Sequence, residues 1–124
     1  MAVPILKLGD VLVASIQAAL SDNDLVELRD SLADTIGRCR ARGVVLDVAA
    51  IDILDSFATK TIRSIAYTAK LRGALPVVVG IQPEVAIAMV QLGLTLDGIA
   101  TALDLEEGLE LVQKRRPIGG RRAG

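Results

Sequence analysis

Two short runs of β-branched residues constrain the fold more than any other feature of the sequence. One covers Val44–Val48 and the other lies within Leu75–Ile81, and both are almost wholly apolar. Strands of this composition are typically covered on both faces, as in parallel sheets. Each run is followed by a segment of helical length, which predicts right-handed βαβ crossovers. We therefore expect an α/β fold with a mixed central sheet of four to five strands.

About four helices are expected around this sheet. Apolar residues recur every three or four positions from Leu25 to Cys39, after several candidate N-caps in Ser21–Asp24. This spacing predicts an amphipathic helix, which Gly43 is placed to end. Further helices are expected over 57–72, over 84–92 and from about residue 103 onward.

The two ends of the chain complete the predicted sheet. Gly9-Asp10 separates two β-prone runs, Pro4–Leu8 and Val11–Ile16, as in an N-terminal β-hairpin. Ile99-Ala100 is expected to form a brief last strand. The 124 residues have room for one domain, which we place at residues 1–116.

Charge is distributed unevenly along the chain. Five of the 14 lysines and arginines lie in the last eleven positions, whereas all 15 acidic residues precede them. Residues 117–124 are expected to be a disordered basic tail. The tail is interpreted either as a solvated terminus or as a contact for an acidic partner or RNA.

The composition excludes several kinds of chemistry. The chain has no histidine, and Cys39 is its only cysteine, so it lacks the usual ligands of a zinc site and the imidazole of a catalytic triad. Glycine-rich nucleotide-binding motifs and a G-x-S-x-G elbow are also missing from the sequence. We expect no enzyme activity, no cofactor and no metal, and neither nucleic acid nor membrane as a partner. The chain is expected to be cytoplasmic, because its N-terminus resembles an opening strand and not a signal peptide.

Three aspartates follow the first buried run. One interpretation makes Asp47, Asp52 and Asp55 helix caps and turn formers. The other makes them a paired-carboxylate site for acid–base catalysis. A pair of carboxylates works as acid and base only if one of them is desolvated enough to hold a proton near neutral pH.

Ser56 is the residue that stands out as a candidate site. It lies between a buried strand and a helix, at the carboxyl end of the sheet where α/β folds present working groups. One interpretation makes its hydroxyl the N-cap of that helix. The other makes it a phosphorylation switch, because a helix N-terminus tolerates the added negative charge.

Several segments together resemble the STAS domain of anti-sigma factor antagonists, and more narrowly the single-domain stressosome subunits of the RsbS type. The resemblance covers about residues 3 to 113, and the Asp55-Ser56 pair alone is generic to STAS antagonists. The more specific segments are 4–8, 13–17, 55–58, 80–83 and 101–110, with sequences PILKL, VASIQ, DSFA, GIQP and TALDLEEGLE.

This resemblance implies a stressosome scaffold that regulates a stress response. Such a subunit co-assembles with RsbR-type STAS sister subunits into a large cytoplasmic oligomer and sequesters a serine/threonine kinase of the RsbT type. Phosphorylation by that kinase releases it. For this chain, the resemblance implies that Ser56 is the phosphoacceptor and that Asp55, Phe57 and Thr59 are neighbours that bind the partner.

Alternatives to this interpretation remain open at the level of sequence. Thr59 and Thr61 are either alternative acceptors or simply solvent-facing helix residues. Sister subunits carry a second phosphorylatable residue in the helix after the Gly-Ile-x-Pro turn, but 86–88 offer no hydroxyl here, so one site is expected. Two other interpretations are a simple anti-sigma factor antagonist that binds an anti-sigma kinase outside any large assembly, and a small enzyme or nucleotide-binding domain.

Overall fold

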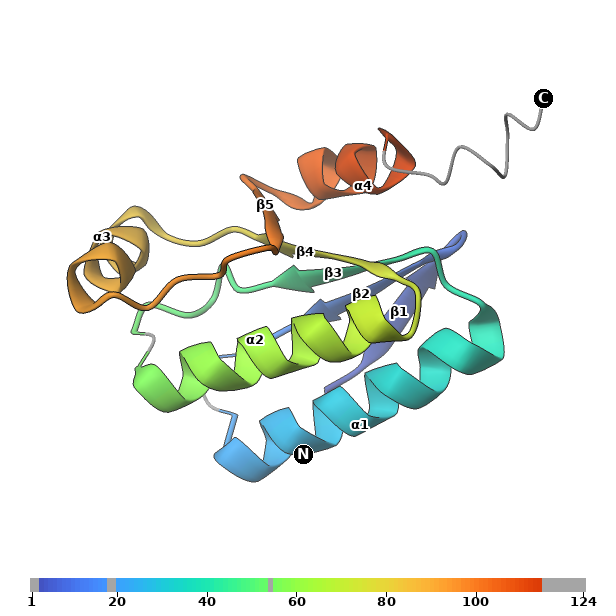
Figure 1. Cartoon of the computed structure of the whole chain (residues 1–124), viewed down its shortest axis with the longest axis horizontal. Coiled ribbons are helices and arrows are strands. Elements are labelled where there is room, and N and C mark those ends of the chain that lie inside the picture. Colours follow the sequence, from blue (N-terminus) through green and yellow to red (C-terminus); the bar gives the residue numbers. More distant parts are fainter. Residues whose placement is uncertain (1–2, 18–19, 54, 115–124) are drawn as a thin grey trace.

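A twisted sheet of five strands runs through the described part of the chain (Figure 1). The computed structural model describes residues 3–17, 20–53 and 55–114, with strands β1 (Ile5–Leu8), β2 (Val11–Ser15), β3 (Gly43–Asp47), β4 (Leu75–Val79) and β5 (Ala100–Ala102). The strand order is β1-β2-β3-β4-β5; β1 pairs antiparallel with β2, and each later pair is parallel. The predicted α/β class, the mixed sheet and the N-terminal hairpin are confirmed.

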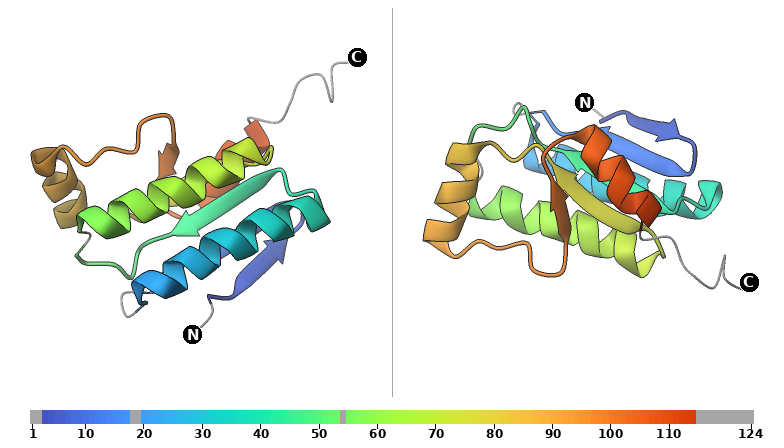
Figure 2. Two further views of the ribbon diagram at one scale, coloured as in Figure 1. Left: turned by 60° about the horizontal axis from the view of Figure 1, so that its bottom comes forward. Right: turned by 90° about the horizontal axis from the view of Figure 1, so that it is seen from above.

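Helices cover both faces of this sheet. The helices are α1 (Asp22–Cys39), α2 (Ser56–Leu71), α3 (Pro83–Leu92) and α4 (Leu105–Lys114). Helices α1 and α2 lie side by side on one face, α4 lies on the other, and α3 lies beyond one end of the sheet (Figures 1 and 2). The four expected helices are therefore present.

The two-residue period of the strands explains these layers. In β3, Val44 and Leu46 belong to the hydrophobic cluster beneath α1 and α2, whereas Val45 belongs to the cluster beneath α4. Successive side chains of a strand point to opposite faces. An almost wholly apolar strand is therefore buried on both sides, as its composition predicts.

The end of α1 differs from its prediction. Arg40, and not Gly43, is the C-cap, with a left-handed backbone at φ 53° and a backbone N–H that donates to the carbonyl of Ile36. Gly43 opens β3 instead. A Cβ atom built on Gly43 would lie 2.6 Å from both methyl carbons of Val112, so the missing side chain lets α4 approach the sheet.

Other boundaries shift by one or two residues. Strand β4 ends at Val79 and not at Ile81, and β5 spans Ala100–Ala102 where Ile99-Ala100 was expected. Helix α2 begins and ends one residue earlier than predicted. The predicted basic tail, residues 117–124, lies outside the described residues, and so does Leu54.

One end of the domain collects the N-termini of three helices. The carboxyl ends of β2, β3 and β4 lead to the starts of α1, α2 and α3 on the same side of the sheet (Figures 1 and 2). Gln82, the N-cap residue of α3, donates from Nε2 to the carbonyl of Ala49 at 2.8 Å, which ties α3 to the loop after β3. We call this the carboxyl end of the domain; Ser56 lies there.

Candidate functional site

Asp55 is the N-cap of α2. Its backbone is extended, and its Oδ1 accepts a hydrogen bond from the backbone N–H of Ala58 at 2.7 Å. The same carboxylate lies at the positive end of the helix dipole, which favours negative charge. Asp55 therefore caps α2, which is the role that one interpretation of the sequence gave to the Ser56 hydroxyl.

Ser56 is the first residue of α2, and its side chain is exposed. The interpretation of its hydroxyl as the N-cap is wrong, because an N-cap lies outside the helix and Ser56 lies inside it. A residue in the first turn points its side chain near N–H groups that lack helical partners. The hydroxyl is thus both accessible and next to a local positive potential.

Two apolar side chains flank Ser56 at the surface. Ile53 is 82% exposed and Phe57 is 44% exposed. Exposed apolar residues beside a candidate site are typical of protein-binding surfaces. We call Ile53, Asp55, Ser56 and Phe57 the Ser56 surface. Ile53 was not predicted from the sequence as part of the site, although an isoleucine next to Asp52 in a turn was a visible signal.

The two threonines of α2 do not belong to this surface. Thr59 is 0% exposed and Thr61 is 8% exposed. The Thr61 hydroxyl donates to the carbonyl of Phe57 at 2.9 Å, whereas the buried Thr59 Oγ1 has no hydrogen-bond partner among the described residues. Both were expected to face solvent, and that expectation is wrong. Thr59 is therefore not placed to contact a partner, and neither threonine is an accessible acceptor.

A small pocket adjoins the Ser56 surface. It has a volume of about 130 Å³ and includes Asp22, Ile53 and Asp55 in its lining. Pockets that enclose cofactors or drug-sized ligands are usually about 300–1,000 Å³. The pocket lies between the starts of α1 and α2, and the carboxylates of Asp22 and Asp55 both line it.

Two of the three aspartates at the end of β3 and beyond it serve as a turn former and a helix cap. Asp47 Oδ1 accepts from the backbone N–H of Ala49 at 2.9 Å, Asp55 caps α2, and Asp52 is exposed. Within 3–17, 20–53 and 55–114, the acidic residues and Cys39 form no group of three or more that could hold a metal ion. Over the same residues, no helix is long and apolar enough to cross a membrane.

A family model adds to this geometry. The model of the STAS domain matches residues 2–108, which include every strand and the Ser56 surface. The chain belongs to the STAS family. The resemblance found in the sequence is thereby confirmed at the level of the family.

Solved STAS structures extend the comparison over most of the chain. A serine-to-glutamate variant of RsbS from Moorella thermoacetica is 37% identical, with a TM-score of 0.78 over 90% of this chain and 95% of that one. A chain in a structure of the stressosome, described as a signal integration and transduction hub, is also 37% identical, with a TM-score of 0.78 over 90% and 96%.

A curated relative matches only in part. The RsbT co-antagonist protein RsbRA of Bacillus subtilis (strain 168) is 25% identical over 83 residues, which are 67% of this chain. The chain spans 30% of that relative's length. This STAS domain is therefore similar to almost the whole length of the two solved chains and to one portion of a longer relative.

Proposed function

We propose that this STAS protein is a stressosome scaffold subunit that binds a serine/threonine kinase of the RsbT type and releases it when Ser56 is phosphorylated. The observation that carries the proposal is the division of roles in the first turn of α2. Asp55 caps α2, so the Ser56 hydroxyl is not needed as a cap. Ser56 is also exposed. The similarity to RsbS and to a stressosome chain supports the scaffold role.

Release follows from the chemistry of the Ser56 surface. A phosphate adds about 1.5 to 2 negative charges at pH 7. The start of α2 accommodates this charge through the helix dipole, so the fold is retained. A kinase docked over Ile53 and Phe57 would instead have to desolvate the new dianion beside Asp55, which weakens the complex.

The proposed partners follow from the relatives. RsbRA is described as a co-antagonist of RsbT, and its matched portion is similar to this chain. We therefore assign RsbR-type sister subunits and a cytoplasmic assembly to the proposal. In this role the chain is a substrate and a binding partner and performs no catalysis. Helix α3 carries no hydroxyl at 86–88, so the proposal has a single acceptor.

The acceptor is tested by mass. The chain is incubated with the kinase and Mg-ATP, and the intact mass is measured. One phosphate per chain is expected, with none on Ser56→Ala. Thr59→Val and Thr61→Val, which alter the buried hydroxyls, should be phosphorylated like the wild type. Full phosphorylation of Ser56→Ala would overturn the assignment.

The plain antagonist is the second candidate function, because the STAS fold is shared by proteins of both kinds. It predicts a complex of one kinase and one or two copies of this chain. The scaffold predicts a large particle when the chain is purified with an RsbR-type subunit. Electron microscopy of that mixture separates the two, since only the scaffold gives a large closed particle.

A further inference from the structure

The end of the domain opposite Ser56 carries a basic groove of about 560 Å³. It is lined by the last turns of α1 and α2 and by the residues that follow them. Three of the lining residues, Arg40, Arg42 and Arg72, are exposed arginines, and we call this feature the arginine groove. Ligand sites usually have volumes of about 300–1,000 Å³. The arginine groove is therefore large enough to hold a ligand.

Arg40 has a backbone conformation that does not suit its residue type. Its φ is 53°, and among the described residues it is the only one besides glycines with a positive φ. Glycine is the usual residue at a left-handed helix end. Any side chain is unfavourable there, because its Cβ atom lies too close to the following carbonyl oxygen. Glycine would therefore end α1 better than Arg40 does, so helix capping does not explain this arginine.

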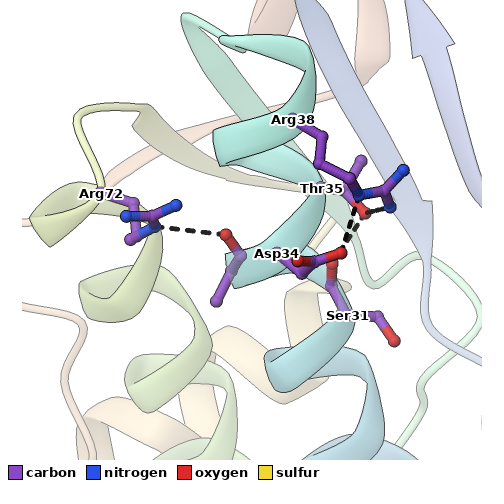
Figure 3. Close-up of polar contacts among 6 residues, drawn as sticks. Ser31, Asp34, Thr35, Arg38 and Arg72 are labelled. Atoms are coloured by element: carbon purple, nitrogen blue, oxygen red, sulfur yellow. Dashed lines mark hydrogen bonds and ion pairs between the residues drawn. The ribbon is translucent and has the colours of Figure 1, made fainter.

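A second position in the arginine groove also lowers the stability of α1. Gly37 lies inside the helix, where glycine is less favourable than alanine because it loses more backbone entropy on folding. A Cβ atom built on Gly37 would collide with Nη2 of Arg72. Arg72 reaches across from the end of α2 and donates from Nε to the carbonyl of Ala33 at 3.2 Å (Figure 3). The missing side chain of Gly37 thus leaves room for the Arg72 guanidinium.

Both unfavourable choices keep a positive charge in the groove. Arg42 pairs with Asp10 at 3.0 Å, whereas Arg40 and Arg72 have no carboxylate partner among the described residues. Each helix C-terminus is equivalent to about half a negative charge, so the ends of α1 and α2 offset about one of these two positive charges. About one unit of positive charge remains. Stability that is given up at one place in this way is expected where a site has a function.

An acidic peptide fits the arginine groove better than a nucleic acid does. Guanidinium groups bind carboxylates through paired hydrogen bonds. Residues 1–113 include nine basic and fifteen acidic residues, a net charge of −6, so the groove is a short basic region on an acidic domain. A long polyanion would be repelled beyond the groove. The lining also contains no aromatic residue on which a nucleobase could stack.

The positions of the two guanidinium groups predict a spacing for the carboxylates. The Arg72 guanidinium lies along α1 at the level of Ala33 and Gly37. Arg40 follows three to seven residues later, which is an offset of about 5–10 Å along the helix axis. In an extended peptide, alternate side chains point to the same side and are about 7 Å apart. Carboxylates at every second position of a peptide therefore match the groove.

We propose that the arginine groove binds an extended acidic segment of a partner protein, in which alternate carboxylates pair with Arg72 and Arg40. The 18 residues of α1 separate this groove from the end that carries Ser56 by about 27 Å. The kinase and the acidic segment can therefore be bound at the same time. This site is separate from kinase capture and gives the subunit a second partner.

Calorimetry with a short synthetic peptide tests this site. The peptide has blocked ends and carries glutamate at every second position. Wild type should bind it at about 50 mM salt, and binding should weaken by about tenfold at about 500 mM salt, because salt screens exposed charges. The same peptide with glutamine in place of glutamate should not bind. A single-stranded RNA of similar length should bind more weakly than the acidic peptide.

Substitutions in the groove separate binding from stability. Arg40→Gly relieves the left-handed strain and Gly37→Ala favours the helix, so both should raise Tm by about 2–4 °C. Both should also weaken peptide binding, and Arg40→Gly should do so by about tenfold or more because a charged hydrogen-bonding group is lost. Arg40→Gln keeps the strain and should lose binding at an unchanged Tm. Arg38→Gln is the matched control and should bind normally, because Asp34 already neutralises Arg38 at 2.7 Å (Figure 3).

Several results would overturn the proposal. They are absence of peptide binding by the wild type at low salt, equal binding by wild type and Arg40→Gln, a lower Tm for Arg40→Gly, and tighter binding of RNA than of the peptide. The groove variants should still be phosphorylated on Ser56, and the phosphorylated wild type should bind the peptide as the unmodified chain does. This site and the proposed function can therefore fail separately.

Discussion

The first turn of α2 gives the sharpest prediction about stability. Asp55→Ala removes the hydrogen bond to the backbone N–H of Ala58, and loss of an N-cap costs about 1 kcal/mol of unfolding free energy. For 124 residues, unfolding entropy of about 2.1 cal/mol/K per residue converts this cost into a fall of about 4 °C in Tm. Ser56→Ala removes no cap and should change the free energy by less than about 0.5 kcal/mol.

Thermal and urea unfolding followed by circular dichroism measure both changes. Asp55→Asn is the matched control, because asparagine caps a helix about as well as aspartate. It should stay near wild type although it loses the charge. If Ser56→Ala were the destabilised variant and Asp55→Ala were neutral, the serine would be the cap, and the division of roles would be refuted.

Three further predictions concern the packing and the charges of the described residues. Thr59→Val replaces a buried hydroxyl that has no hydrogen-bond partner in the described part of the chain and should raise the unfolding free energy by about 1 kcal/mol in urea titrations; a clear loss would contradict this. Gly43→Ala places a methyl group 2.6 Å from the methyl carbons of Val112 and should cost about 1–3 kcal/mol, part of which Val112→Ala should restore in the double variant. The backbone N–H of Ser21 donates to Asp24 and lowers the pKa of that carboxyl below 3.8. The stability that the ionised Asp24 contributes to the fold is therefore present above pH 3.8 and is lost as the pH falls through the lower folded-state pKa. Asp24→Asn should reduce this loss of stability at acid pH, as measured by melts at a series of pH values.

The regular spacing of apolar residues predicted most of the fold, because that spacing is determined by which face of each helix or strand is buried. The apolar strands alternate between two covered faces, and the residues of α1 predicted to be inward are buried from Leu25 to Ile36. Helix ends were harder, because neighbouring residues compete for the same role. Asp55 and Ser56 are both good N-caps, and only the register of α2 on the sheet decides between them.

Thr59 shows a signal that the sequence contained and the prediction missed. It lies three residues before Ile62 and seven before Ala66, both of which are buried, so it belongs to the same helical stripe. Its hydroxyl suggested a surface position instead. The closeness of Arg40 to Arg72 had no comparable signal, since these two residues are brought together only by the packing of α1 against α2.

The most direct test of the account measures kinase binding before and after phosphorylation. The chain is phosphorylated to one phosphate on Ser56, and the affinity of the kinase for both forms is determined by calorimetry in the same buffer, with Ser56→Asp as a stable mimic. Phosphorylation should weaken binding by at least about tenfold, which is about 1.4 kcal/mol, and Ser56→Asp should weaken it in the same direction while leaving the circular dichroism spectrum unchanged. Equal affinity of the kinase for the two forms would contradict the switch.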